Sequence, residues 1–515
     1  MDPSRHDEVE RKYDVGPATV FPSLVDVDGV STVSQAVEHE LEAVYYDTAE
    51  LDLARNGTTL RRRTGGDDAG WHLKLPTAGD ARIELHQPLG RATATVPPQL
   101  LGPVRTLVRD RPLVPVARIR TRRLVRDLRG PHGVTLAEVC DDQVHTERLH
   151  GPSLTQDWRE WEVELVDGDR TLLDLVERHL HDVGATAAPV ASKLARSLGD
   201  ALPAAPTGPA REPLPRKQLS RGSAAQLVRF HLTEHLAALH AQDSRLRTDQ
   251  PGAVHKLRIA ARRLRSLLKT YQPLFEPGSA DTIGEELRWL GQSLAAARDA
   301  QVLRERLDAL VGSEPTELVI GPVRARIDDE LNSAFRTGRE QALTALDSDR
   351  YFRLLDSLDE FVGSTPLTPT GNAPAMELLP RLLQRDAKRL RRMVGRTATS
   401  ADPRQHDAAL HEARKKSKRL RYAAESAVPV FGKRARKLAA ASKAVQQALG
   451  EHQDTVIARV RLREYGVQAH LSGENGFTFG RLHALEQARA DQAEREFEAA
   501  WRAVPATKLK RWIRT

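Results

Sequence analysis

Cysteine is almost absent from this sequence: Cys140 is the only one among 515 residues. An intrachain disulfide is therefore impossible, which excludes the small disulfide-stapled folds of secreted proteins and favours a reducing compartment. Long apolar runs are also missing, since no stretch approaches the roughly 18 apolar residues of a membrane span. The charged start, residues 1–14, is not that of a signal peptide. We therefore expect a cytoplasmic protein without a membrane partner.

Aromatic residues are scarce as well, at 4% of the chain, whereas hydrophobic residues make up 40%, enough for cores. Ala, Leu and Arg dominate, and this composition favours helices. A chain of this length is expected to hold two or three domains. The net charge of +8 is modest. The distribution of the basic residues is more informative than their total, because they are clustered.

The densest cluster is residues 255–269, HKLRIAARRLRSLLK, which carries six Lys or Arg and no acid. On a helix, His255, Arg258, Arg262, Arg265 and Lys269 fall within about 80° of one another. Leucines and alanines occupy a different face of the same helix. One face therefore packs, and the neighbouring face is a self-repelling row of cations that a polyanion would neutralise.

This stretch occurs twice. Residues 411–431 align without a gap on residues 255–275 at a constant offset of 156 residues, so that His255 matches His411. The following helix repeats less closely, as 294–302 and 449–457, with Asp299 matching Asp454. We interpret these two acids as salt-bridge support for the basic rows. The duplication predicts two similar helical units packed as a pair.

Composition along the chain predicts three parts. Residues 1–201 contain short alternating runs separated by turns and are predicted to be β-rich, with helices near 31–42 and 171–183. Residues 202–215 hold five prolines, so 202–221 is predicted to be the linker. Residues 222–515 have helical spacing, with halves of about 222–365 and 374–515. The fold class is α+β multidomain.

The N-terminal strands carry charges at alternate positions, which share one face of a sheet. The opposite phase is mostly apolar. A solvated sheet face explains any single pair, but not all the strands together. An antiparallel barrel with a lumen of acids and bases satisfies both phases, and such a lumen suits a phosphate chain with a divalent metal. The alternating charged positions are Glu8, Glu10 and Lys12; Arg61 and Arg63; His72 and Lys74; Arg82 and Glu84; Arg118, Arg120 and Arg122; Glu138 and Asp142; and Glu160, Glu162 and Glu164.

The run Glu8-Val-Glu10-Arg-Lys12 resembles the ExExK signature of the CYTH, or triphosphate tunnel, family, and later runs such as WHLKLP, WEVEL and ASKL follow in that family's order. The resemblance implies a closed tunnel that binds triphosphate with Mg²⁺ or Mn²⁺. It implies that Glu8, Glu10, Glu162 and Glu164 lie on the metal side, with Glu138 and Asp142 supporting a second metal. It implies that the phosphate is gripped by Lys12, Arg61, Arg63, Lys74, Arg120, Arg122 and Lys193, with Arg82, Glu84 and Arg118 as further candidates. A shift of one residue in the Arg-rich run 118–123 would place Arg123 inside instead.

The duplicated HxxRxxxRRxR and HxxRxxxKRxRY motifs resemble the CHAD family, an α-helical domain with pseudo-twofold symmetry that is associated with polyphosphate. Basic rows of this kind are usually solvated helix faces; here the row is doubled and a third run follows near residue 385. Nucleic acid is the rival polyanion, but no aromatics interleave the cations and no zinc pattern appears. The predicted polyphosphate-binding residues are His255, Arg258, Arg262, Arg263, Arg265, Lys269, Arg385, Lys388, Arg389, His411, Arg414, Lys415, Lys418, Arg419 and Arg421.

These resemblances imply a metal-dependent hydrolase of inorganic tripolyphosphate, with Lys12 and Glu8, Glu10, Glu162 and Glu164 at the reacting centre and Mg²⁺ or Mn²⁺ as cofactor. The C-terminal domain would bind long-chain polyphosphate, in the cytoplasm or on polyphosphate granules. Two alternatives stay open. The protein could be a non-catalytic polyphosphate-binding protein, or its tunnel could act on a nucleoside or thiamine triphosphate.

Overall fold

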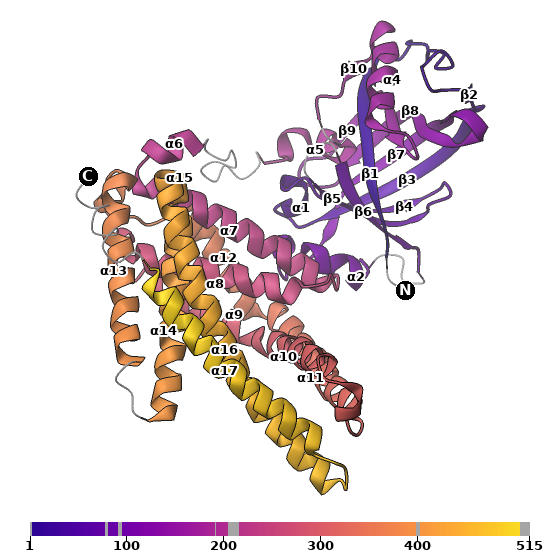
Figure 1. The fold of residues 1–515 in the computed structure, drawn as a ribbon. Coiled ribbons are helices and arrows are strands. Elements are labelled where there is room, and N and C mark those ends of the chain that lie inside the picture. The colour runs from indigo at the N-terminus through magenta and orange to yellow at the C-terminus, as the bar shows by residue number, and fades with distance from the viewer. Residues whose placement is uncertain are drawn as a thin grey trace. The chain divides into compact units, whose positions relative to one another are not determined.

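The computed structural model describes residues 3–77, 81–90, 95–190, 192–203, 216–397 and 402–504. The chain divides into two compact units, Met1–Thr207 and Gly208–Thr515 (Figure 1). The predicted domain limits, 201 and 222, lie on either side of this division. The proline-rich segment predicted to be the linker falls mostly on residues 204–215, which lie outside the described residues.

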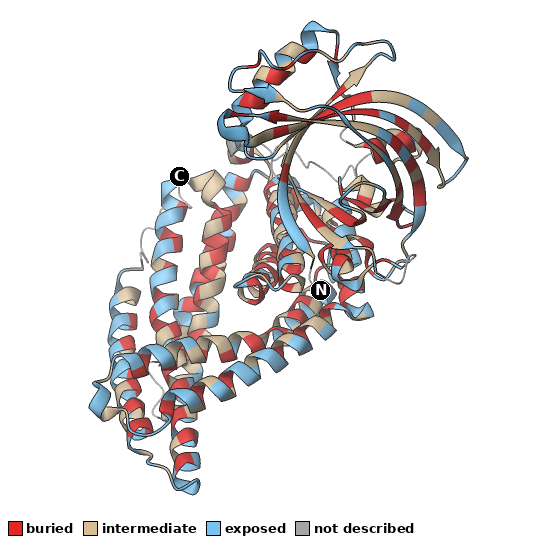
Figure 2. Ribbon diagram, turned by 90° about the vertical axis from the view of Figure 1, so that its right-hand side faces the viewer, coloured by how far each residue is buried: buried red, intermediate tan, exposed pale blue. Residues whose placement is uncertain are grey.

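The N-terminal unit is built mainly of strands. They are β1 (Ser4–Val15), β2 (Thr32–Val33), β3 (Val37–Asp47), β4 (Thr59–Thr64), β5 (Gly70–Pro76), β6 (Ala81–Pro88), β7 (Val114–Arg129), β8 (Thr135–Arg148), β9 (Leu154–Leu165) and β10 (Thr186–Ala187). In the described part of the chain, the order β1-β6-β5-β4-β3-β7-β8-β9 closes into a ring, because β1 pairs antiparallel with both β6 and β9. The predicted antiparallel barrel is confirmed (Figure 2).

Parts of the outer face of the barrel are apolar and pack under helices. Helix α4 (Arg170–Asp182) is capped by Asp169 and buries Leu172 and Val176 against Trp161. This confirms the helix predicted at 171–183. Three more short helices cover another part of the barrel, α1 (Asp52–Arg55), α2 (Pro98–Leu101) and α3 (Arg105–Val108), and α5 (Lys193–Leu198) packs beside β7, β8 and β9.

The helix predicted near residues 31–42 is wrong. The structure places the short strand β2 and most of β3 there, and β3 pairs with β4 and β7 along its length. Within β3, His39, Leu41 and Tyr45 line the lumen, whereas Glu38 and Glu42 bond arginines on the outside. Pairing with two neighbours decides the conformation, although Glu, Leu and Ala favour helix when taken singly.

The second unit is helical. Its longer helices are α7 (Ala224–Arg247), α8 (Ala253–Tyr271), α9 (Asp281–Ser293), α10 (Ala295–Gly312), α11 (Val323–Leu346), α12 (Asp349–Ser364), α13 (Ala375–Thr397), α14 (Pro403–Ser426), α16 (Lys433–Leu471) and α17 (Phe477–Arg502). Shorter ones are α6 (Arg216–Arg221) and α15 (Val428–Phe431). The predicted all-helical C-terminal region is confirmed.

The two copies of the repeated sequence form equivalent helices in this unit. The two basic stretches lie on α8 and α14, and each is followed by a partner helix, α9–α10 in the first copy and α16 in the second. One core runs through both copies and includes Leu257 and Leu264 of the first with Leu420 and Leu449 of the second. Among the described residues, no helix is long and apolar enough to cross a membrane.

Candidate functional site

The barrel encloses a cavity of about 580 Å³, and charged side chains from most of the strands face it. Inward alternation along each strand brings together residues that are far apart in sequence. The cavity is lined by the predicted residues Glu8, Glu10, Lys12, Arg61, Arg63, Lys74, Arg82, Glu84, Glu138, Glu162, Glu164 and Lys193. Most of the residues predicted for a charged lumen therefore do face one cavity.

One part of this wall is a cluster of guanidinium groups. The Nε atoms of Arg61 and Arg63 are buried and have no hydrogen-bond partner within the described chain. Burial and the neighbouring charges of Arg61 and Arg123 lower the pKa of Arg63 to about 9. Arg63 also forms an ion pair with Asp68, which follows the turn after β4. Buried donors without acceptors are costly, so this wall is suited to an anion with several oxygens.

A row of carboxylates crosses three neighbouring strands. Glu10 on β1 is the cross-strand partner of Glu164 on β9, and Glu164 is the partner of Glu138 on β8. Glu10 contacts Lys12 at 2.8 Å between Oε2 and Nζ, and although burial opposes ionisation, Lys12 and Lys74 lower its pKa to about 2. Neither Glu138 nor Glu164 has an ion-pair partner in the described chain. Like charges directly opposite each other repel, so the row needs a cation.

Two further observations fit a divalent metal at this row. The Oε2 atom of Glu8 is buried without a hydrogen-bond partner, although its Oε1 binds Lys74. Burial, together with the charges of Glu8 and Glu10, raises the pKa of Glu164 to about 7. Clustered carboxylate oxygens are the ligands that Mg²⁺ and Mn²⁺ prefer. These carboxylates would therefore fit a divalent metal.

A second acidic cluster is already neutralised. One oxygen each of Asp142, Glu160 and Glu162 lie within 4.8 Å of one another, which could also hold a metal. However, Lys193 Nζ lies 2.9, 2.6 and 2.7 Å from these three carboxylates. Arg123 adds a bidentate contact to Asp142, at 2.8 and 2.6 Å. In this structure the ammonium of Lys193 therefore neutralises the second cluster.

The prediction that Arg120 and Arg122 face the lumen is wrong. Arg122 forms a bidentate pair with Glu38, at 2.8 Å for both contacts, and Arg120 binds Glu42 at 2.8 Å; all four side chains are largely exposed. Arg118, a further candidate, pairs with Glu147 on the same outer side. Pairing of β7 with β3 and β8 selects the other phase of this run.

Arg123 occupies the inward position instead, as in the alternative register. Its two carboxylate partners, Asp142 and Glu162, outweigh the cost of burial and raise its pKa well above the ordinary value. Both phases of the run 118–123 contain arginine, so alternation alone could not choose between them. His72, which alternation also placed on the charged face, is buried and lies 2.6 Å from the lining residue Glu84, between its Nδ1 and Glu84 Oε1.

In the helical unit, the duplicated rows meet at one centre. Arg258 binds Asp299 at 2.8 Å and its counterpart Arg414 lies 3.8 Å from Asp454, as the interpretation of these two acids as salt-bridge support predicts. Arg262 donates from Nε to the Tyr422 hydroxyl at 2.9 Å. Burial and the charges of Arg414, Arg262 and Arg258 lower the pKa of Lys418 to about 7. The two copies thus bring together Arg262 and Lys418, neither of which has an acidic ion-pair partner among the described residues.

Other predicted basic residues serve the fold. Arg385 donates to the backbone oxygens of Lys269 and Thr270, Arg419 to Asp386 and the Lys269 oxygen, and Arg389 to Asp386. Lys415 is exposed and pairs with Glu412. Lys388 is exposed. His411 bonds Gln453 at 2.7 Å, and burial lowers the pKa of both His411 and His255. Arg263 and Arg421 share Glu425.

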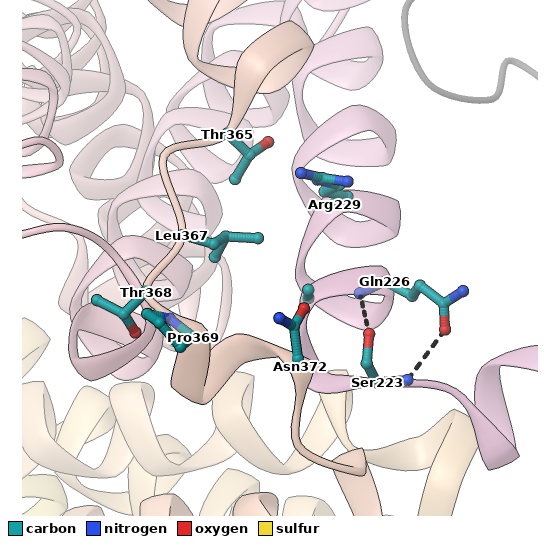
Figure 3. Close-up of a pocket in the computed structure, with 9 residues that line it drawn as sticks. Ser223, Gln226, Arg229, Thr365, Leu367, Thr368, Pro369 and Asn372 are labelled. Atoms are coloured by element: carbon teal, nitrogen blue, oxygen red, sulfur yellow. Dashed lines mark hydrogen bonds between the residues drawn. The ribbon is translucent and has the colours of Figure 1, made fainter.

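A pocket of about 570 Å³ lies where the first turns of α7 meet the loop after α12 (Figure 3). Its hydroxyl groups are used by the fold: Ser223 and Gln226 form a capping box, Thr365 donates to the Val362 oxygen, and Thr368 donates to the Leu274 oxygen. We therefore attribute its polar lining to the fold.

The fold and the site define a two-part protein: a charged antiparallel tunnel and a duplicated, basic helical domain. Residues 6–198 match the CYTH domain and residues 231–463 match the CHAD domain. Uncharacterized proteins from two strains of Mycobacterium tuberculosis are 40% identical over 97% of this chain and 96% of their own length. The chain therefore belongs to the family of proteins that join a CYTH domain to a CHAD domain. CYTH domains are those of phosphate-transfer enzymes that depend on metal ions.

Solved structures resemble each half separately. The CHAD domain of the plant Ricinus communis is 23% identical, with a TM-score of 0.44, over 56% of this chain and 93% of that chain. A Hippeastrum protein with a dominant triphosphatase activity is 18% identical, with a TM-score of 0.24, over 37% of this chain and 93% of that chain.

Proposed function

We propose that the tunnel hydrolyses inorganic tripolyphosphate to phosphate and pyrophosphate with Mg²⁺ or Mn²⁺, and that the helical domain binds long-chain polyphosphate. The observation that carries the first part is the pairing, in one cavity, of buried guanidinium Nε donors that lack a hydrogen bond with two carboxylates, Glu138 and Glu164, that lack an ion-pair partner among the described residues. A triphosphate bound with a divalent metal would satisfy both groups. Its oxygens accept hydrogen bonds from the arginines, and the metal that it carries can be bound by the carboxylates.

The chain's own residues divide the work. Arg61 and Arg63 bind oxygens of the phosphate chain and hold it in line for attack by water. Glu8 and Glu10 would hold the metal, which would supply positive charge against the phosphate oxygens. Glu164, which lines the same cavity as Glu8 and Glu10 and has no ion-pair partner among the described residues, accepts the proton that the attacking water loses. Water adds to the terminal phosphorus, the bridging P–O bond breaks, and pyrophosphate leaves.

The alternatives are weaker on specific grounds. Tyr45 is the only Phe, Tyr or Trp among the described lining residues, and its hydroxyl accepts from Arg61 at 3.4 Å. A nucleoside substrate would find little to stack on. A purely binding tunnel would not need carboxylates without ion-pair partners, such as Glu138 and Glu164, because carboxylates repel a phosphate chain.

The test is phosphate release from tripolyphosphate, ATP and long-chain polyphosphate, each with Mg²⁺ and with Mn²⁺. Wild type should act on tripolyphosphate, and Glu10→Gln should lower its kcat/KM by roughly 10³-fold, since charge neutralisation and metal binding are lost together. Glu42→Gln, on the outer face of β3, is the matched control and should stay within about twofold. Inactivity of wild type on all three substrates would favour the binding-protein alternative, and a preference for ATP the nucleotide one.

A further inference from the structure

The duplicated basic rows differ at their outer ends. Extending the alignment places Lys269 of α8 opposite Glu425 of α14, and Gly291 of α9 opposite Gln446 of α16. The first copy therefore has a cation (Lys269) and a glycine (Gly291) at the two positions where the second copy has hydrogen-bond acceptors (Glu425 and Gln446). The two ends therefore offer a polyanion different surfaces, although the helices that carry them are equivalent.

The end of the first copy is open. Arg265 and Lys269 on α8 and Arg288 on α9 have no acidic partner among the described residues, and the Nε atom of Arg265 is buried without a hydrogen bond. Burial and the charge of Arg288 lower the pKa of Arg265, and burial with Arg265, Arg419 and Lys416 lowers that of Lys269. These groups crowd one another and lack an anion.

The end of the second copy is closed. Arg421, the counterpart of Arg265, donates to Glu425 Oε1 at 2.7 Å and to Gln446 Oε1 at 3.2 Å. Glu425 Oε2 also accepts from Arg263 at 3.4 Å. Two cations are thus neutralised by one carboxylate that would itself repel a phosphate chain passing over it.

The centre between the two ends belongs to both copies. Lys418 of α14 lies near Arg258 and Arg262 of α8, and Arg414 is near them too. Arg262 and Arg265 are one helical turn apart, and Lys269 follows one turn later. Cations are therefore continuous from the centre to the open end, but an acid interrupts them toward the closed end.

Resting on the proposed polyphosphate binding, we infer that a long polyphosphate chain leaves the shared centre on one side only, over Arg265, Lys269 and Arg288, and that Glu425 blocks the equivalent path over Arg421. The ligand class is a flexible, linear polyanion long enough to extend beyond the centre. The pseudo-twofold domain would then hold its ligand asymmetrically, with one copy supplying the outer contacts.

Pseudo-symmetry supplies matched variants for the full-length protein. With long-chain polyphosphate as the probe, Arg265→Gln with Lys269→Gln should weaken binding about ten- to hundredfold and reduce the slope of log affinity against log salt by about 1.4. Arg421→Gln should change affinity less than about threefold, because its charge is already paired. Glu425→Lys, which restores the residue type of the first copy, should strengthen binding by roughly tenfold and steepen the salt dependence.

A smaller gain is expected for Glu425→Gln, which removes the acid without adding a cation and guards against misfolding of the lysine variant. Equal losses for Arg421→Gln and the Arg265/Lys269 pair, or no gain for either Glu425 variant, would overturn the asymmetry while leaving polyphosphate binding intact. If wild type does not bind polyphosphate, or binds duplex DNA of equal charge as tightly, the proposed function of this domain fails instead.

Discussion

The tunnel and the helical centre are both rich in cations, but they treat those cations oppositely. In the tunnel, carboxylates outweigh burial and raise the pKa of Lys12 and Lys193. In the helical centre, burial and neighbouring cations lower the pKa of Arg414 and Lys418. The carboxylates around Lys12 and Lys193 are thus neutralised before any ligand arrives, whereas the cations of the helical centre repel one another until a polyanion binds. The tunnel, where acids and bases are mixed, suits a metal and a reaction. The helical centre, where cations predominate, suits binding alone.

The comparison can be tested most severely at Lys193. Replacing Lys193 with Met leaves Asp142, Glu160 and Glu162 buried with less compensation and should cost about 3–5 kcal/mol of unfolding free energy. Denaturant titration measures this loss. Because the stranded carboxylates would titrate at higher pH, the deficit should shrink as the pH is lowered.

Arg196→Met is the control for that variant, since Arg196 lies on the same helix and pairs with Asp14 at 2.6 Å near the surface. It should cost under about 1 kcal/mol. A Lys193→Met protein as stable as Arg196→Met would mean that the acidic cluster does not depend on its lysine.

Within the tunnel, Arg63 is the cation that most resembles those of the helical centre, because burial and like charges lower its pKa to about 9. Arg63→Met should lower kcat/KM for tripolyphosphate by roughly 10²–10³-fold, since a preorganised donor is lost. Arg122→Met, on the outer face, should leave the kinetics unchanged. Equal losses would restore the inward assignment of Arg122.

At the helical centre, Arg262→Glu with Lys418→Glu should weaken long-chain polyphosphate binding by roughly 10²-fold or more, because each change reverses a central charge. Tripolyphosphate hydrolysis should be almost unchanged. Titration and the phosphate-release assay on the same preparation separate the two activities, and a large fall in hydrolysis would show that the two domains are coupled.

The smallest expected effect is a pH dependence. Lys418 is charged below its pKa of about 7 and neutral above it; Arg414, Arg262, Arg258 and Asp454 are the charges that surround it. Bound polyanion favours the protonated form, so polyphosphate affinity should fall about three- to tenfold between pH 6.5 and 8.5. Lys418→Arg should flatten this profile, since arginine stays charged. An unchanged slope in that variant would assign the dependence to other groups.

Local pattern predicted much of the protein. Strict alternation identified the lumen residues of β1, β4, β5 and β9, because side chains of a strand point to its two faces in turn. The gap-free repeat of α8 in α14 predicted the paired helical units, and the absence of acids between the basic residues predicted a row of cations on each helix. These features depend only on residues that are close in sequence, so they can be predicted without knowing the tertiary contacts.

Only the tertiary structure decided the rest. Alternation gives two phases but not which is inside, and in the run 118–123 both phases carry arginine; hydrogen bonding of β7 to β3 and β8 turned Arg123 inward and Arg120 and Arg122 outward. In the same way, pairing with β4 and β7 makes the Glu-rich residues Val37–Asp47 a strand, β3. Whether a cation is free depends on acceptors from other helices, as Glu425 and Gln446 show at Arg421. Such contacts join residues distant in sequence, so no local pattern records them.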